Sequence, residues 1–229
     1  MIIKKAVATA TYALGLIVLV IIVGRDYAGT RAFGRYREAR SRVRSIRSGL
    51  PELERHLLKA VHIWPRRVFF EELANLYYDA ALAEIRSGTE GKRKMLLDKA
   101  GDVLLEEIRR YPAAADGYSN LGRVYMSYND PYLTHAAKGR AYLKEALILQ
   151  PADEYLNTNI LTVMLSQWEI LDPAERIDVR SRLRDILDHN EAFIYEILDL
   201  WKKNHASVDD LKKILSADAE LWTHLKKFF

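Results

Sequence analysis

The sequence predicts an all-α protein built from successive helical hairpins, and three observations lead to this prediction. Glycine is scarce, with 11 residues among 229, and no long alternation of apolar and polar residues suggests a strand. A short pattern of residues that begins at Phe70 returns 48 residues later at Tyr118. Three runs with helical spacing end alike, at Pro65, Pro112 and Pro151, because proline cannot continue a helix.

The composition limits the classes of protein to consider. A length of 229 residues suits one domain with an appendage. Cysteine is absent, which excludes disulfides, thiolate metal sites and a thiol nucleophile. The formal net charge of +4 is unevenly distributed, because eight arginines from Arg25 to Arg47 face only Asp26 and Glu38, whereas residues 48–229 sum to −4. The basic character therefore belongs to the N-terminal region.

Residues 6–24 form an uncharged run of 19 residues that is dense in Leu, Ile and Val from Leu14 onward. As a helix this run would measure roughly 28 Å, close to the thickness of a bilayer core. No small-residue cleavage site follows it, so the sequence predicts a transmembrane anchor over residues 1–24 in preference to a cleaved signal peptide. The expected location is a bacterial inner membrane, crossed once. The arginines after the run favour a cytoplasmic soluble domain, and Lys4 and Lys5 favour the opposite orientation.

Residues 25–49 are predicted to form a second, basic segment. Its arginines alternate with apolar residues such as Phe33, Tyr36 and Val43 at spacings of three or four, which indicates an amphipathic helix. Anionic lipid headgroups are the expected partner, and nucleic acid is a less favoured alternative because no recognition motif is present. Packing of the apolar stripe on the following helices is a third interpretation, compatible with the first. The candidate headgroup ligands are Arg25, Arg31, Arg35, Arg37, Arg40, Arg42, Arg44 and Arg47.

The recurring pattern consists of an aromatic residue, then a leucine followed by a small residue, then a tyrosine. Small residues such as Ala74, Ala100, Gly122 and Gly139 would let two helix backbones approach closely, and the larger ones would fill the space between hairpins. The two copies of the pattern are Phe70, Leu73, Ala74 and Tyr77, and Tyr118, Leu121, Gly122 and Tyr125.

In this pattern the chain resembles the tetratricopeptide repeat (TPR) family, whose unit is a pair of antiparallel helices. Each copy is followed by a second helical run that closes at a proline, Pro112 or Pro151. The two units exceed the family length of 34 residues by about 14 and about 5 residues, and Glu107 stands where the family usually has Ala. The resemblance implies TPR-like repeats over residues 50–171 that stack into a solenoid. An unrelated bundle of helical hairpins is the alternative.

The C-terminal residues 172–229 are predicted to form a helical cap. Asp172, Pro173 and Glu175 have the order of an N-cap, a first helical position and a capping-box partner. Terminal units of a solenoid need an atypical helix on their open side. A docking role for the last helix, which ends in Phe228 and Phe229, is the alternative.

No pattern of residues indicates catalysis. The six histidines are dispersed, and the sequence has no His-Glu-x-x-His run, no glycine-rich phosphate loop and no serine elbow. We therefore expect no catalytic or metal-binding residues, no cofactor, no small-molecule substrate and no enzymatic activity.

The TPR resemblance implies that the inner surface of the solenoid binds a protein partner. The expected function is that of a membrane-anchored scaffold or assembly subunit in a membrane or cell-envelope complex. A membrane-surface adaptor that binds anionic lipid, and an accessory protein of envelope polysaccharide or lipopolysaccharide machinery, are the alternatives. Carried over from the family, the groove positions are Glu71, Asn75, Tyr78 and Asp79, then Ser119, Arg123, Met126 and Ser127, and in a poorly matching third unit Thr158, Thr162 and Leu165.

Overall fold

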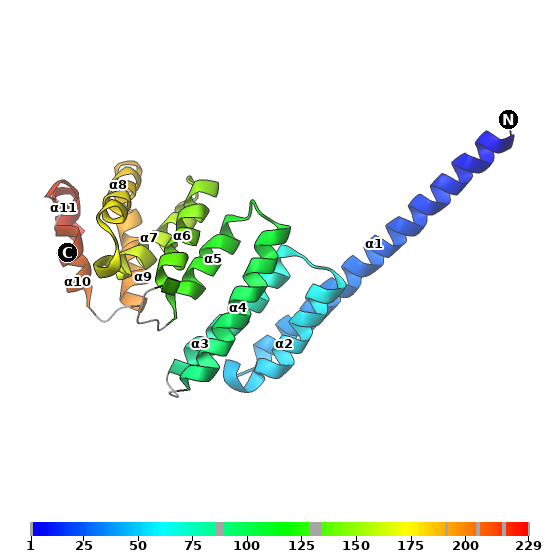
Figure 1. The fold of residues 1–229 in the computed structure, drawn as a ribbon, viewed down its shortest axis with the longest axis horizontal. Helices are drawn as coiled ribbons and strands as arrows, with labels where there is room; N and C mark the ends of the chain where they lie inside the picture. The colour runs from blue at the N-terminus through cyan, green and yellow to red at the C-terminus, as the bar shows by residue number, and fades with distance from the viewer. Residues whose placement is uncertain are drawn as a thin grey trace. The chain divides into compact units, whose positions relative to one another are not determined.

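The computed structural model describes residues 2–85, 89–128, 134–190, 192–204, 207–216 and 219–228 (Figure 1). Over these ranges every regular element is a helix and no strand is present, which confirms the all-α prediction. The elements are α1 (Ile2–Arg42), α2 (Ile46–Ile63), α3 (Arg67–Ile85), α4 (Glu90–Arg110), α5 (Ala115–Met126), α6 (Thr134–Leu149), α7 (Glu154–Ser166), η1 (Trp168–Ile170), α8 (Pro173–His189), α9 (Phe193–Asn204), α10 (Val208–Ser216), α11 (Ala219–Leu225) and η2 (Lys226–Phe228).

The chain forms two compact units. Unit 1 comprises residues 1–113 and 127–129, and unit 2 comprises residues 114–126 and 130–229. In unit 1, α1 packs on α2, α2 on α3 and α3 on α4, so that neighbours in sequence are neighbours in space (Figure 1). In unit 2, α5 packs on α6, and α7 contacts α5, α6, α8 and α9. In each unit, helices that follow one another in the sequence therefore pack on one another.

The prediction of a transmembrane anchor over residues 1–24 is wrong, and the predicted single-pass membrane location is wrong with it. Within the described residues, no helix combines the length and the apolar character needed to cross a bilayer. The side chains of residues 1–13, which supply part of the predicted span, lie outside the described part. The 18-residue window that begins at Leu14 already contains Arg25, Asp26 and Arg31. The helix itself continues past the predicted boundary as far as Arg42.

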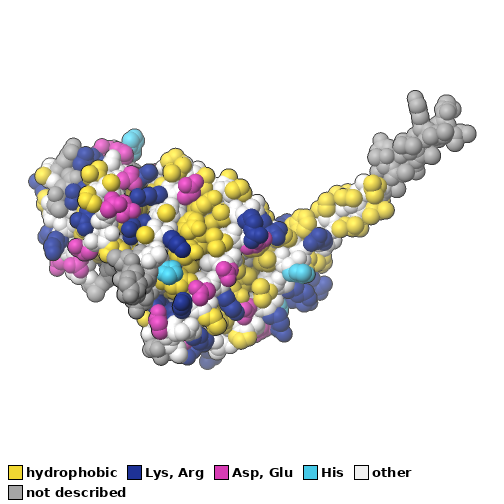
Figure 2. Space-filling view, viewed as in Figure 1, with side chains coloured by type: hydrophobic (Ala, Val, Ile, Leu, Met, Phe, Trp, Pro, Cys, Tyr) yellow, Lys and Arg dark blue, Asp and Glu magenta, His cyan; other side chains and the backbone are white. Residues whose placement is uncertain are grey.

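The first half of α1 and its second half have different surroundings. From Leu14 to Val23 the apolar side chains are exposed, and Figure 2 shows them at the surface of the helix. From Gly29 onward, one stripe of α1 is buried against α2 and α3. A Cβ atom on Gly29 would lie 2.8 Å from Cβ of Trp64, so glycine is what permits this close approach. The packing interpretation of the amphipathic segment is therefore confirmed for its apolar stripe.

A half-buried polar group connects the three helices that follow α1. Glu54 of α2 accepts hydrogen bonds from the Tyr77 hydroxyl of α3 at 2.7 Å and from Lys99 Nζ of α4 at 2.8 Å. Burial alone would raise the pKa of Glu54, but the hydrogen bonds from Lys99 and Tyr77 together lower it. The carboxylate therefore stays ionised and holds α2, α3 and α4 together.

Two glycines allow α5 and α6 to pack closely in unit 2. A Cβ atom on Gly122 would lie 2.6 Å from Cδ2 of Leu143 and 2.9 Å from the carbonyl oxygen of Gly139. A Cβ atom on Gly139 would in turn lie 2.8 Å from the carbonyl oxygen of Gly122. The prediction that these small residues lie where two helix backbones approach is confirmed.

The start of α8 follows its sequence signal. The Asp172 side chain accepts a hydrogen bond from the Glu175 backbone N–H at 2.8 Å, and the Glu175 side chain accepts one from the Asp172 backbone N–H at 3.1 Å. Pro173 occupies the first turn, where its missing N–H costs no hydrogen bond. The predicted capping box is confirmed.

Candidate functional site

The outer face of α3 in unit 1 carries the first set of predicted groove residues. Asn75 and Asp79 are exposed on this face. Val68 lies seven residues before Asn75, and Leu82 lies three residues after Asp79, so both are on the same stripe of the helix. Val68 is 40% exposed and Leu82 is 39% exposed. The opposite face of α3 is buried in the core. The helix therefore presents an amide and a carboxylate between two exposed apolar side chains.

A fixed polar pair lies between α1 and α3. The hydroxyl of Tyr36, whose side chain is buried, donates to Oε2 of Glu72 at 3.0 Å. Burial raises the pKa of Tyr36, and the negative charge of Glu72 raises it further. The positive charge of Arg40 lowers the pKa of the same hydroxyl, and the negative charge of Asp79 raises it. This group of charges therefore borders the exposed stripe of α3 on the α1 side.

The remaining residues of the first set are partly engaged within unit 1. The Tyr78 hydroxyl lies 3.0 Å from Oγ of Ser127, and the ring is half-buried. Glu71 forms an ion pair with Arg67 at 3.0 Å, and its side chain is 20% exposed. The structure thus brings all four residues of the first set onto one helix, but Asn75 and Asp79 offer the most surface.

The second set of predicted groove residues offers less surface. Ser119 is buried, with 5% of its surface exposed. Met126 packs toward α6, where its Cγ would lie 2.7 Å from a Cβ on Gly139. Arg123 is half-buried and, like Asp79 of the first set, already has an interaction partner within the chain. These three residues belong to unit 2, whereas Ser127 belongs to unit 1.

The third set is buried. Thr158, Thr162 and Leu165 are 1%, 5% and 1% exposed. The two hydroxyls donate to carbonyl groups of their own helix, Thr158 to Glu154 at 2.7 Å and Thr162 to Thr158 at 2.8 Å. These residues offer no surface to a partner.

The exposed stripe of α7 lies one position away from the predicted one. Tyr155 is 76% exposed, and Asn159, Val163 and Ser166 are half-buried on the same side of the helix. The family spacing placed Asn157 at the aromatic landmark of this unit.

The arginines of the basic segment divide into engaged and exposed groups. Nε of Arg25 donates to the Ile63 carbonyl at 3.0 Å, and its guanidinium lies over the Trp64 ring. Arg42 pairs with Glu38 and Arg47 with Glu84, and Arg40 is half-buried. Four arginines are exposed and make no ion pair within the described part of the chain: Arg31, Arg35, Arg37 and Arg44.

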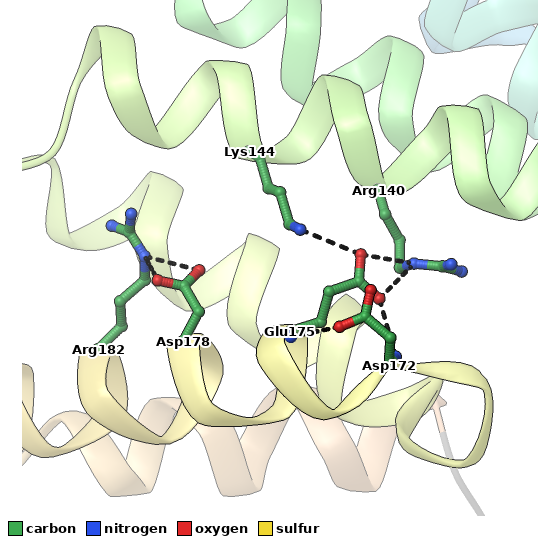
Figure 3. A network of polar contacts seen from close by, with 6 residues as sticks. All are labelled: Arg140, Lys144, Asp172, Glu175, Asp178 and Arg182. Carbon is green, nitrogen blue, oxygen red and sulfur yellow. Dashed lines mark hydrogen bonds and ion pairs between the residues drawn. The ribbon is translucent and has the colours of Figure 1, made fainter.

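The strongest polar network of unit 2 is a structural contact between helices. Glu175 of α8 is bound by Arg140 at 3.0 Å and by Lys144 at 3.1 Å, both from α6 (Figure 3). Burial by itself would raise the pKa of Glu175. The hydrogen bond from the Asp172 backbone N–H and the two cations outweigh burial, so the pKa is lowered. The carboxylate is fully occupied by these partners. The residues covered by the structure contain no group of three or more His, Asp or Glu arranged for a metal ion.

No protein-family model matches the sequence, and no curated protein is significantly similar to it. The TPR resemblance and the functional interpretation therefore stay predictions based on the residues themselves.

Proposed function

We propose that this protein is a helical-repeat scaffold of TPR-like construction that binds a segment of another protein. The outer face of α3 is the observation that carries the proposal. There Asn75 can hydrogen-bond a partner's backbone, Asp79 can accept from its donors, and Val68 and Leu82 supply apolar contacts on either side. A helical face of this mixed composition suits an extended or helical segment.

Two features favour binding over catalysis. The groups with shifted pKa values, Tyr36, Glu54, Tyr77 and Glu175, are all held by hydrogen bonds or ion pairs that join helices. None of these bonds is arranged as a nucleophile and base, which acyl or phosphoryl transfer would need. A scaffold needs only a rigid face with exposed recognition groups, which α3 supplies.

Replacing Asn75 by alanine or Asp79 by lysine is expected to lower the recovery of co-purified partner proteins about tenfold, because a central contact residue typically contributes 1–2 kcal/mol or more. The measurement is quantitative mass spectrometry of proteins that co-purify with the full-length chain. Asp102→Lys is the matched control, since Asp102 is also exposed but lies on α4. If all three variants recover the same amount of partner protein, the face of α3 is not the binding site. Melting temperatures of the variants should remain close to that of the wild type.

The exposed arginines favour a second candidate, an adaptor that binds anionic lipid. Arg31, Arg35, Arg37 and Arg44 make no ion pair with the described residues, so their charges are available to an anionic surface. Each such charge contributes about 1 kcal/mol near an anionic lipid surface, or about a fivefold change in affinity.

Reversing Arg31 and Arg35 to glutamate is accordingly expected to abolish binding to phosphatidylserine-containing vesicles. Vesicle co-sedimentation of the full-length chain measures this, with neutral phosphatidylcholine vesicles as the baseline. Reversal of Lys94, exposed on α4, changes the charge of one site in the same sense and should have little effect. If the wild type binds both kinds of vesicle alike, charge does not direct the interaction and this candidate fails.

A further inference from the structure

The hairpin of α1 and α2 has a large excess of positive charge. Residues 25–66 contain 11 lysines and arginines and four carboxylates. The carboxylate of Glu52 is exposed. The other three already form ion pairs, which are Asp26 with Arg66, Glu38 with Arg42, and Glu54 with Lys99. Most cations of this hairpin therefore form no ion pair within the described residues.

The two helices of the hairpin run antiparallel, and their contacts fix which residues lie side by side. Nε of Arg25 on α1 donates to the carbonyl oxygen of Ile63 near the end of α2. Further along α1, Ala32 lies in one buried cluster with Ala60. At this register two pairs of cations lie at about the same level of the hairpin, which are Arg31 with Lys59 and Arg35 with Arg55.

Arg31 and Arg35 lie on the side of α1 that faces away from α3. Both are exposed and come directly before a buried residue, Ala32 or Tyr36. Phe33 comes directly after Ala32, and its ring centre lies 4.8 Å from that of Phe69 on α3. Since successive residues of a helix are turned by about 100°, residues before and after the buried ones lie on opposite flanks.

Arg55 and Lys59 lie on the corresponding side of α2. They are four residues apart, so they share a stripe of the helix, and both are exposed. Glu54 marks the opposite flank, because its carboxylate contacts Tyr77 of α3 and Lys99 of α4. Both pairs of cations therefore border the outer side of the hairpin.

These four residues, Arg31, Arg35, Arg55 and Lys59, are called the hairpin cluster below. None of them makes an ion pair or a side-chain hydrogen bond with the described residues. The nearest carboxylates along the two helices are Glu38, which already pairs with Arg42, and the exposed Glu52. Like charges at neighbouring positions repel one another, so an anionic partner would relieve this repulsion.

We propose that the hairpin cluster is one composite surface for anionic lipid headgroups, to which α2 contributes Arg55 and Lys59. Two antiparallel helices side by side present their charges over a broad face, which suits a layer of headgroups better than a single phosphate. Each cation close to such a layer raises the affinity about fivefold. This inference rests on the lipid adaptor function proposed above and extends its binding surface to a second helix.

The part of α1 that precedes the cluster favours lipid over nucleic acid as the anionic partner. Tyr27, one turn before Arg31, is 66% exposed, and the apolar side chains from Leu14 to Val23 are exposed as well. Tyrosine and aliphatic side chains find apolar partners at the boundary between headgroups and acyl chains. A nucleic acid offers phosphates but no comparable apolar layer.

The test is co-sedimentation of the full-length chain with vesicles of phosphatidylserine and phosphatidylcholine in equal parts. Reversing Arg55 and Lys59 together to glutamate is expected to weaken binding by about 25-fold or more, because two fivefold contributions are lost and repulsion is added. Arg55→Lys combined with Lys59→Arg keeps both charges and should bind like the wild type. Lys94→Glu combined with Lys138→Glu changes the net charge equally at exposed sites outside the hairpin, and this control should also bind like the wild type.

The outcomes separate the composite surface from the adaptor function. Circular dichroism of each variant checks that the fold is retained. If vesicles of phosphatidylcholine alone bind the wild type equally well, the adaptor function itself fails. If reversal of Arg31 and Arg35 abolishes binding but reversal of Arg55 and Lys59 does not, the adaptor function stands and the composite surface is wrong.

Three further results would overturn the proposal. An equal loss of binding in the control variant would mean that net charge, and not the hairpin cluster, directs the interaction. Displacement of the vesicles by inorganic phosphate, at a concentration matched to the headgroup phosphates, would mean that the cluster holds a free phosphate. Displacement by a single-stranded oligonucleotide at the same phosphate concentration would assign the cluster to nucleic acid.

Discussion

Replacing Gly122 by leucine is expected to destabilise unit 2 by about 3 kcal/mol, because the contact between α5 and α6 has no room for a side chain. A Cβ atom alone would lie 2.6 Å from Cδ2 of Leu143 and 2.9 Å from the carbonyl oxygen of Gly139. The side chain of Leu143 can rotate, but the carbonyl belongs to the backbone of α6. Relief of the clash therefore requires α5 and α6 to separate.

Gly122→Ala tests the clash of the Cβ atom alone, without the rest of a leucine side chain. In an exposed helix, Gly→Ala is stabilising by about 1 kcal/mol, because alanine restricts the unfolded chain. A Cβ atom on Gly34 of α1 would meet no atom of a neighbouring element within 4 Å, so Gly34→Ala should raise the unfolding midpoint. Gly122→Ala should lower it. Urea or thermal unfolding compares the two, and a rise for both would show that α5 and α6 are not closely packed at this position.

The elements predicted correctly from the sequence are those with a local physical cause. The capping box of Asp172 and Glu175 involves residues three apart, so its geometry follows from the residue types alone. The small residue of the repeated pattern, Gly122, also lies at the predicted helix contact. In the first copy of the pattern, Leu73 and Tyr77 are buried as helical spacing requires.

The register of α7 could not be predicted in the same way. Thr158 and Thr162 were expected to face a partner, yet both are buried, as is the neighbouring Asn157. Their side chains bond to nearby backbone carbonyl groups, such as that of Asp153 for the Asn157 amide at 2.9 Å. Such bonds satisfy a polar side chain locally, so polarity no longer indicates exposure. The exposed side of this helix is decided by what packs around it.

At the candidate site, too, some features follow from local sequence and others depend on how the helices pack. The spacing of the TPR family to Phe70 predicted four groove residues on α3, of which Asn75 and Asp79 are exposed and Glu71 and Tyr78 are half-buried. The hairpin cluster has no such local signal, because its cations come from two different helices. Their proximity follows from the antiparallel packing of α1 on α2.

Replacing Glu175 by alanine is expected to cost about 3 kcal/mol of stability in unit 2, because it leaves a charged partner without its counter-ion. The side chain of Arg140 is only 13% exposed, and its Nε lies 3.0 Å from Glu175 (Figure 3). The change also removes the acceptor for the Asp172 backbone N–H at the start of α8. Two contributions to stability, between helices and within α8, are therefore lost together.

The neighbouring ion pair of the same helix provides the control. Asp178 lies 3.3 Å from Arg182, and these side chains are 43% and 31% exposed. A pair so accessible to water typically contributes less than about 1 kcal/mol. Asp178→Ala should therefore change the urea midpoint much less than Glu175→Ala. Equal shifts would mean that Glu175 gains nothing from its burial between α6 and α8.

The pH dependence of Glu175→Gln tests the charge itself, since glutamine keeps an acceptor for the Asp172 backbone N–H. The folded-state pKa of Glu175 lies below its ordinary value of 4.5. A carboxylate with a lowered pKa stabilises the fold above its unfolded-state pKa, and this stabilisation disappears as the pH falls through the folded-state value. The stability difference between wild type and Glu175→Gln should therefore be largest well above pH 4.5 and shrink as the pH falls below it. A difference that stays constant over this range would show that shape, and not charge, makes Glu175 important.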